Sequence, residues 1–242
     1  MQRYFLTESD FNNKTISGDD VFHICKVMRN KPGDMIEVCY NNIAYLAKIV
    51  DISSDSVTYE TLSIISENSE NKAKITLFQG FPKGDKTDDI IKHGTELGVD
   101  DIILFQMKRS IVKIENNKIE SKLNRYQKIA KEAAEQSHRN SIPTVKISNN
   151  IKEIDFCSYD LKLLLDEEEA KKANGLLLKL IDFTDKNNII FVVGPEGGID
   201  DKERTYFIEN GFIPISIGKN ILRTETASLA FLAMLNYEFM GK

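Results

Sequence analysis

One loop of the sequence has the residue types that suit binding of a charged small molecule. The apolar run at residues 189–193 is followed by Gly194-Pro195-Glu196-Gly197-Gly198. Three glycines in five positions give the backbone unusual freedom and let a ligand approach the main chain closely. The spacing differs from the G-x-G-x-x-G and G-x-x-x-x-G-K-[ST] phosphate loops, and Glu196 would repel a pyrophosphate. A carboxylate among free backbone amides predicts a neutral or cationic ligand.

A second polar cluster lies about twenty residues further along the chain. A strand-like segment, 213–217, ends at Gly218, and a short apolar loop then leads to four consecutive polar residues. A helix capped by Thr226 would explain the apolar residues that follow, but not an arginine and a glutamate just before it. Residues 227–235 are apolar on nearly every face, so we expect burial on all sides, within their own domain or against another subunit. The four polar residues are Arg223, Thr224, Glu225 and Thr226.

Two helical segments carry further polar residues. Residues 86–98 form an ordinary amphipathic helix, for which we predict a structural role. Residues 118–139 form a basic helix that ends in Gln136-Ser137-His138-Arg139, shortly before Pro143, and this ending is a candidate binding cluster. The three histidines of the chain are far apart with no ligand spacing, so no metal site is predicted.

The first seventy residues are predicted to be rich in β-strands. Residues 35–40 and 43–52, joined by Asn41-Asn42, form a predicted hairpin, and 56–65 is a third alternating segment. A short helix over 18–29 ends in a turn at 31–34, and residues 66–72 form the predicted linker. Four aromatic residues are expected in the core of this small domain rather than on a base-stacking surface: Tyr4, Phe5, Phe22 and Tyr40.

From residue 74 onwards, apolar strands alternate with helices. Uniformly apolar strands separated by helices predict a mostly parallel sheet covered on both faces. In such folds, ligands bind at the loops that follow the strands, which is where Gly194 and Glu196 lie. Asp200 and Glu203 have the spacing of a helix N-cap pair. The predicted strands are 74–80, 101–106, 161–166, 188–193 and 212–218, and the helices are 86–98, 118–139, one after Asp200 and one from about Thr226.

Composition sets limits on the class of protein. The 242 residues suffice for one large or two modest domains, and no apolar run is long enough to span a membrane. We see no secretory signal, and three widely spaced cysteines suit a reducing cytoplasm, so a cytoplasmic protein without a disulfide framework is expected. The net charge is −5, yet residues 81–140 hold 12 Lys/Arg against 10 Asp/Glu, which leaves room for a local basic surface that binds nucleic acid.

These clusters, in this order, resemble the RsmE family of 16S ribosomal RNA (uracil-N3)-methyltransferases of the SPOUT superfamily. The similarity covers nearly the whole chain, through "QRYF", "HICKVMRNKPGD", "KGDKTDDIIKHGTELGV", "EAAEQSHRNSIP", "VVGPEGGI" and "IGKNILRTETA". The resemblance implies a PUA-like RNA-binding β-barrel at 1–70 and, at 71–242, a SPOUT α/β domain with a C-terminal deep trefoil knot. It also implies a homodimer whose site lies near the subunit contact, and a substrate uridine in the decoding region of the small subunit.

The resemblance also implies roles for individual residues. S-adenosyl-L-methionine would bind in a bent shape in the knot loops, and RNA would contact the N-terminal domain. Many relatives have a small residue where this chain has His138, so Arg139 is the better candidate there. The implied RNA-binding residues are Arg3, His23, Arg29 and Arg139. The implied cofactor-binding residues are Leu165, Gly194, Glu196, Gly197, Gly198, Ile217, Gly218, Leu222, Arg223, Thr224, Glu225, Thr226 and Ala227.

Methylation of uracil N3 requires removal of its proton, by a base or with help from a cation that stabilises charge on O2 or O4. Glu225 or Glu196 is the candidate base, and Arg223 or Arg139 the candidate cation. Glu196 could instead face the positive end of the cofactor. The alternatives are methylation of another RNA such as transfer RNA, a non-enzymatic RNA-binding assembly factor, and an oxidoreductase, which the missing dinucleotide fingerprint disfavours.

Overall fold

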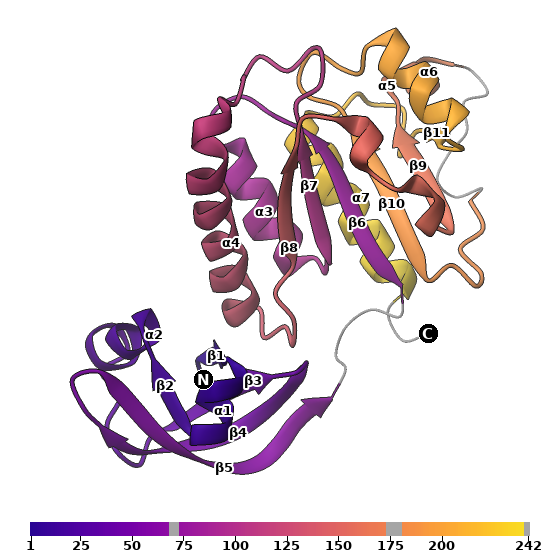
Figure 1. Ribbon diagram of the computed structural model, residues 1–242. Helices are drawn as coiled ribbons and strands as arrows, with labels where there is room; N and C mark the ends of the chain where they lie inside the picture. The colour runs from indigo at the N-terminus through magenta and orange to yellow at the C-terminus, as the bar shows by residue number, and fades with distance from the viewer. Residues whose placement is uncertain (68–72, 173–180, 240–242) are drawn as a thin grey trace. The chain divides into compact units, whose positions relative to one another are not determined.

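The computed structural model describes residues 1–67, 73–172 and 181–239, and the chain forms two compact units. The N-terminal unit comprises Met1–Glu70 and Ala134–Ile142, and the sheet unit comprises Asn71–Ala133 and Pro143–Lys242 (Figure 1). Segment 134–142 thus joins the N-terminal unit although it follows much later in the sequence. Most of the predicted linker, residues 68–72, lies outside the described residues.

The N-terminal unit contains a five-stranded sheet of order β1-β3-β4-β5-β2, in which only the β1–β3 pairing is parallel. The predicted hairpin is confirmed as β3 and β4. Asn41 and Asn42 have φ values of 49° and 60°, the left-handed conformations that a two-residue hairpin turn needs. The strands are β1 (Arg3–Phe5), β2 (Thr15–Ser17), β3 (Met35–Tyr40), β4 (Ile43–Ile52) and β5 (Ser56–Glu67).

The helical part of this unit is short. The predicted helix near residues 18–29 is present as α2 (Asp19–Phe22) followed by a π-helix (His23–Val27). The turn at 31–34 is confirmed, since Asp34 N donates to Lys31 O at 3.0 Å and Lys31 N to Asp34 Oδ2 at 2.8 Å. Helix α1 (Glu8–Asn13), capped by Thr7, was not predicted, because its six residues show no apolar period.

The core of the N-terminal unit corrects one of the aromatic assignments. Tyr4 is fully buried, as predicted. Phe22 is 65% exposed, so its prediction as a core residue was wrong. Val21 and Ile24 already occupy the buried face of the α2 and π-helical segment, and Phe22, adjacent to Val21, is left in solvent.

The sheet unit contains six parallel strands in the order β11-β9-β10-β6-β7-β8, which confirms the predicted α/β class with a mostly parallel sheet. Strand β8 was not predicted, because a strand at the sheet edge is half exposed and its T-V-K-I-S pattern lacks a continuous apolar run. The strands are β6 (Lys74–Gly80), β7 (Asp101–Phe105), β8 (Thr144–Ser148), β9 (Leu161–Leu165), β10 (Asn188–Val193) and β11 (Ile213–Ile215).

Helices cover this sheet, and α3 and α7 lie against each other behind it in the view of Figure 1. On one side Phe207 of α6 packs on Phe78 of β6, with ring centroids 5.7 Å apart. Phe231 of α7 packs on Phe191 of β10 at 4.7 Å. The helices are α3 (Lys86–Glu96), α4 (Ile119–Gln136), α5 (Glu167–Lys171), α6 (Asp201–Glu209) and α7 (Thr224–Phe239), with 3-10 turns at Asn116–Lys118, Ile151–Glu153 and Phe156–Ser158.

Helix α7 differs from expectation in two respects. It starts at Thr224 rather than near Thr226, so Thr226 lies inside the helix and does not cap it. It is also not buried on all sides within its own unit, because Met234 and Tyr237 are 40% and 80% exposed. Contact with another subunit, the other expectation for this helix, therefore stays open. Along the described parts of the chain, none of the helices has the length and apolar character that crossing a bilayer requires.

Candidate active site

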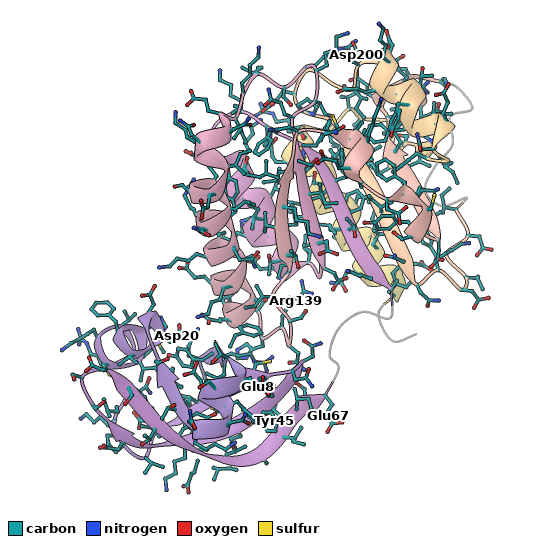
Figure 2. The ribbon with its side chains drawn as sticks, viewed as in Figure 1. Glu8, Asp20, Tyr45, Glu67, Arg139 and Asp200 are labelled. Atoms are coloured by element: carbon teal, nitrogen blue, oxygen red, sulfur yellow. The ribbon has the colours of Figure 1, made fainter. Side chains whose placement is uncertain are left out.

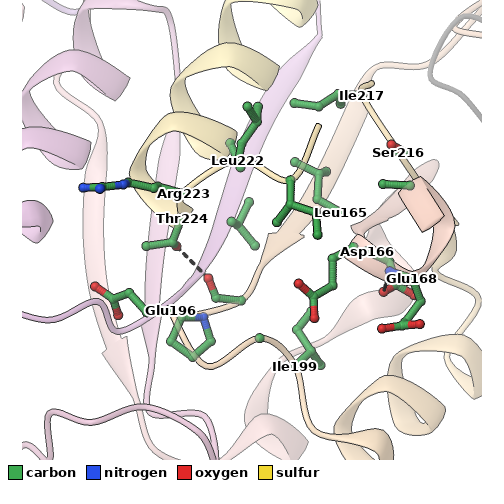
Figure 3. A pocket seen from close by; sticks show the side chains of 18 of the residues that line it. Leu165, Asp166, Glu168, Glu196, Ile199, Ser216, Ile217, Leu222, Arg223 and Thr224 are labelled. Atoms are coloured by element: carbon green, nitrogen blue, oxygen red, sulfur yellow. Dashed lines mark hydrogen bonds between the residues drawn. The ribbon is translucent and has the colours of Figure 1, made fainter. Parts of the chain in front are cut away.

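The loops that follow β9, β10 and β11 converge at one edge of the sheet and enclose a cavity of about 610 Å³ (Figure 3). These three strands are neighbours and parallel, so their carboxyl ends lie at the same edge. The arrangement places Leu165, Gly194 and Ile217 around one space although they are far apart in the sequence. The sequence prediction of a ligand loop at residues 194–198 thus agrees with the position of the cavity.

The glycines of this loop are packed against other atoms of the chain. A Cβ on Gly194 would lie 2.8 Å from Ile199 Cγ1, and one on Gly197 would lie 3.0 Å from the Arg109 carbonyl oxygen. On strand β6, the neighbour of β10 in the sheet, a Cβ on Gly80 would lie 2.6 Å from Pro195 Cδ. Close packing within the protein therefore requires small residues here, in addition to any ligand that approaches the backbone.

The end of the same loop begins helix α6, and the predicted capping is confirmed. Lys202 N donates to Asp200 Oδ1 at 3.2 Å, and Asp200 N donates to Glu203 Oε2 at 3.3 Å. Asp200, labelled in Figure 2, also accepts from Lys108 Nζ at 2.8 Å. The hydrogen bond from Lys108 and those from the helix backbone hold the pKa of Asp200 below its usual range despite partial desolvation. This carboxylate therefore has a structural role, as the cap of α6 and the partner of Lys108.

Thr224, the first residue of α7, joins the two predicted loops. Its Oγ1 donates to the carbonyl oxygen of Gly194 at 2.6 Å, drawn as a dashed line in Figure 3. Thr224 Oγ1 also accepts a hydrogen bond from Gln79 Nε2 at 2.8 Å. Ser228, on the next turn of α7, donates from its hydroxyl to Gln79 Oε1. Since Thr224, Gln79 and Ser228 are all buried, this polar network fixes α7 against β6 and against the loop at Gly194.

A cation that the sequence analysis did not single out lies at the wall of the cavity. Lys86 Nζ is 3.0 Å from Glu196 Oε1 and 3.0 Å from Glu225 Oε2. Its pKa is raised by the two carboxylates, first by the hydrogen bond to Glu196 and then by the neighbouring Glu225. Lys86 begins the helix that follows β6, so its place at the carboxyl edge of the sheet was the available signal. The other wall residues that the sequence analysis did not single out include Arg109, Asp166 and Arg204.

The predicted cofactor residues divide into two groups. Nine of them line the cavity: Leu165, Gly194, Glu196, Gly198, Ile217, Leu222, Arg223, Thr224 and Ala227. Four do not line it: Gly197, Gly218, Glu225 and Thr226. Gly197 packs against Arg109, and the N–H of Gly218 donates to Ser216 Oγ. Glu225 pairs with Lys86, and Thr226 is exposed. Gly218 and Thr226 immediately adjoin wall residues, so spacing alone did not distinguish them.

The four predicted RNA-binding residues all lie in the N-terminal unit. Arg29 is exposed, and His23 Nδ1 lies 3.1 Å from Tyr4 Oη. Arg139, labelled in Figure 2, is buried, and its Nη2 donates to Ser141 Oγ at 3.3 Å. Arg3 is also buried, and its guanidinium donates to Glu37 and to segment 134–142 within this unit.

Comparison with known proteins gives the class first. A family model described as an RNA methyltransferase domain matches residues 69–236, and a model described as an RNA methyltransferase PUA domain matches residues 16–62. The sheet unit with its cavity and the N-terminal unit thus define an RNA methyltransferase that carries a PUA domain. Within the described residues, no group of three or more His, Cys, Asp or Glu side chains is arranged to hold a metal ion.

Individual relatives narrow the class. Ribosomal RNA small subunit methyltransferase E of Bacillus subtilis is 36% identical over 98% of this chain and 97% of its own length. The enzyme of the same name from Mesomycoplasma hyopneumoniae is 33% identical over 96% and 97%. A crystal structure of the Neisseria gonorrhoeae enzyme of this name, bound to S-adenosyl methionine, has a TM-score of 0.85 at 30% identity and covers 99% and 98% of the two chains. The chain belongs to the ribosomal RNA small subunit methyltransferase E family.

Proposed function

We propose that this protein transfers a methyl group from S-adenosyl-L-methionine to small-subunit ribosomal RNA, at N3 of a uridine. The observation that carries the proposal is the cavity whose two loops are joined by Thr224 and Gly194, in a chain 36% identical to a relative named for this activity. The N3 position comes from the family resemblance of the sequence motifs. Methylation requires an in-line approach of N3 to the methyl carbon, which makes alignment the main task of the site.

The residues of the cavity fit the cofactor. A volume of about 610 Å³ is in the range of small-molecule sites. The wall combines apolar side chains, which suit the adenine ring, with five carboxylates and four cationic side chains, a net charge of −1. That charge complements S-adenosylmethionine, which supplies its methyl group from a positively charged sulfur and carries one net positive charge. The charged wall residues are Asp166, Glu167, Glu168, Glu196, Asp201, Lys86, Arg109, Arg204 and Arg223.

Arg223 is the cation that this geometry supports for contact with the RNA. Its side chain is exposed and in Figure 3 extends away from Leu165 and Ile217. A cation there would stabilise negative charge that develops on a uracil oxygen during transfer. Arg139 belongs to the N-terminal unit, where its side chain is buried, and this weakens it as the second candidate for the role.

The N-terminal unit offers a surface for RNA at residues 22–31, which we call the 22–31 surface. Phe22, Val27 and Met28 are 65%, 56% and 45% exposed and lie within seven residues of one another. Lys26, Arg29 and Lys31 are exposed among them, and this stretch has no acidic residue. Exposed aromatic and basic side chains together suit stacking on unpaired bases and pairing with phosphates.

Replacement of Phe22 with alanine is expected to weaken binding of small-subunit ribosomal RNA about 10-fold, because one base stacked on an aromatic ring contributes roughly 1–3 kcal/mol. Binding of S-adenosylmethionine should be unchanged. Fluorescence anisotropy with labelled RNA measures the first quantity and calorimetry the second. Val50→Ala, which removes another exposed apolar side chain of this unit, is the matched control. Equal RNA affinity for Phe22→Ala and Val50→Ala would remove the 22–31 surface from the proposal.

The proposed function is tested in two steps. Calorimetric titration with S-adenosylmethionine should give saturable binding of one molecule per chain. Incubation with radiolabelled cofactor and small ribosomal subunits or their RNA should then label the RNA, and nucleoside analysis should identify 3-methyluridine. Absence of cofactor binding would favour a non-enzymatic assembly factor, and label in transfer RNA alone would favour a different RNA substrate.

Finer features expected from the family are part of the same proposal. These are a C-terminal deep trefoil knot, a barrel form of the N-terminal sheet, and activity in the cytoplasm, where ribosomal RNA is found. A homodimer is supported by Met234 and Tyr237, the apolar residues that α7 leaves exposed in the single chain. Light scattering of the purified protein should give twice the chain mass of 27.5 kDa, and a monomer mass would refute the pairing.

A further inference from the structure

Three charged residues from distant parts of the chain form a cluster at the wall of the cofactor cavity. Lys86 begins α3, Glu196 lies in the loop after β10, and Glu225 lies in the first turn of α7. The Lys86 ammonium is 3.0 Å from each carboxylate, and all three side chains are between one fifth and one third exposed. The cluster, which we call the Lys86 cluster, has a net charge of −1 and is open to a second substrate.

The two carboxylates of the Lys86 cluster differ in what holds them. Glu196 accepts two further contacts from Lys83 N, at 3.0 and 3.2 Å. Burial opposes its ionisation, but hydrogen bonds from its own and the Lys83 backbone N–H and from Lys86 outweigh this and hold its pKa below the usual range. A carboxylate so strongly stabilised as an anion is a weak base. Glu196 is therefore suited to a fixed negative charge at the cavity wall.

Glu225, in contrast, has a carboxylate oxygen that lacks a hydrogen-bond donor within the described residues. Its Oε2 is buried and lies 3.0 Å from Lys86 Nζ, but the direction of approach does not make a hydrogen bond, and the described part of the chain provides no other hydrogen-bond partner for this atom. Such an atom has an unmet requirement for a donor. Lys86 itself cannot be the base, because both carboxylates favour its protonated form.

The position of Glu225 suits a second substrate rather than the cofactor. Lys86 and Glu196 line the cavity, whereas Glu225 touches Lys86 but is not part of the cavity wall. An attacking nitrogen must approach the methyl carbon from the side opposite the sulfur. The acceptor of its proton therefore belongs outside the space that the cofactor fills, yet next to its wall, as Glu225 is.

We infer that Glu225 accepts the N3 proton of the target uracil, and that Lys86 is a positioning residue that holds Glu225 and Glu196 apart on either side of its ammonium. This inference rests on the proposed function. The N3–H bond breaks and its proton passes to the Glu225 carboxylate, while the nitrogen electron pair forms the bond to the methyl carbon. The carbon–sulfur bond breaks with its electrons on sulfur, which leaves a neutral thioether, and Glu225 then loses the proton to solvent.

The inference predicts different effects for changes in the Lys86 cluster. Glu225→Gln should lower kcat about 10²–10⁴-fold, the range for loss of a general base, with cofactor affinity changed less than about 3-fold. Glu225→Asp keeps the carboxylate and should recover part of the rate. Glu196→Gln should weaken cofactor binding more than it lowers kcat. The measurements are steady-state kinetics on small-subunit ribosomal RNA and calorimetry with S-adenosylmethionine.

Lys86→Met removes the cation next to Glu225, so the carboxylate should gain protons more easily and the acid limb of the pH–kcat/KM profile should move to higher pH. Lys86→Arg should restore the profile and most of the rate, and Lys92→Met, an exposed lysine on the same helix, should behave as wild type. A merely structural role for Lys86 would lower the amount of folded enzyme without moving the profile, and would overturn its assignment.

A rate for Glu225→Gln within about 3-fold of wild type, or an equal kcat loss for Glu196→Gln, would overturn the assignment of the base. These outcomes are distinct from failure of the proposed function, in which wild-type protein itself would bind no S-adenosylmethionine or transfer no methyl group to RNA. Circular dichroism of each variant checks that it is folded, so that a lower rate can be attributed to catalysis and not to loss of folded enzyme.

Discussion

Replacement of Arg3 with methionine is expected to lower the free energy of unfolding by about 3–5 kcal/mol, because it removes the guanidinium that pairs with the buried Glu37 carboxylate and leaves that carboxylate its contact with His138. Arg3 is only 3% exposed, and its Nε donates to Glu37 Oε2 at 2.9 Å. Its Nη1 donates to three oxygens of segment 134–142, namely the carbonyls of His138 and Arg139 at 2.7 and 2.9 Å and Asn140 Oδ1 at 2.6 Å. One side chain thus ties this segment into the N-terminal unit.

The expected loss depends on pH. Burial opposes ionisation of Glu37, but hydrogen bonds from His138 and Arg3 and the charge of Arg3 hold its pKa below the usual range. A carboxyl group with a lowered pKa stabilises the fold above its unfolded pKa of about 4.3 and stops doing so as pH falls through the folded value. The difference between wild type and Arg3→Met should therefore be largest near pH 7 and shrink below about pH 4.

Urea unfolding followed by circular dichroism at pH 7 and at pH 3.5 measures this effect. Arg29→Met is the matched control, since Arg29 is an exposed arginine of the same unit. We expect the control to keep its stability and to lose affinity for RNA, whereas Arg3→Met should lose stability. An Arg3→Met protein with unchanged stability and weakened RNA binding would reverse the two assignments and return Arg3 to the RNA surface.

Replacement of Thr224 with valine is expected to cost about 1–3 kcal/mol, because it leaves the Gly194 carbonyl without this donor and removes one of the two acceptors of Gln79 Nε2. The donor to the Gly194 carbonyl is at 2.6 Å, and Gln79 Nε2 would keep only Gly80 O of its two acceptors, each at 2.8 Å. Valine keeps the shape of threonine, so the change removes the hydrogen bonds and little packing. Because the network joins both loops of the cavity, we also expect affinity for S-adenosylmethionine to fall about 10-fold or more.

Thermal unfolding and calorimetric titration measure the two effects of Thr224→Val. Thr226→Val makes the same chemical change two residues further along α7, where the side chain is exposed and outside the cavity wall. That control should match wild type in both measurements. If both valine variants bound the cofactor with wild-type affinity, the link between Thr224 and Gly194 would have no part in shaping the cavity.

Local sequence patterns were sufficient for much of the fold. The run 188–193 was predicted as a strand because a strand covered on both faces is apolar throughout, and the hairpin at Asn41-Asn42 because asparagine tolerates left-handed angles. The helix cap at Asp200 was predicted from the glutamate three positions later, Glu203. Strand β8 and helix α1 were missed, because one alternates at a sheet edge and the other is too short to show a period.

For the candidate site, the two loops could be predicted from the sequence, but the residues that pair with them could be identified only in the structure. The stretches around Gly194 and Thr224 were identified from composition and spacing, and they do line one cavity. Lys86 was passed over, because an amphipathic helix with a lysine at its start has no local feature that marks it as special. Its pairing with Glu196 and Glu225 depends on loops more than a hundred residues away, which only folding brings together.

By itself, the sequence determined most of the strands and helices, the parallel class of the sheet and the two loops at its carboxyl edge, since these depend on residues close together in the chain. Only the tertiary structure decided that Arg3 is an internal anchor, that Phe22 is exposed, and that Glu225 has a buried oxygen beside Lys86 that makes no hydrogen bond within the described residues. Burial and pairing of a side chain are properties of its neighbours in space. Those neighbours come from segments far apart in the sequence, as for Arg3 and Asn140, which are separated by 137 positions.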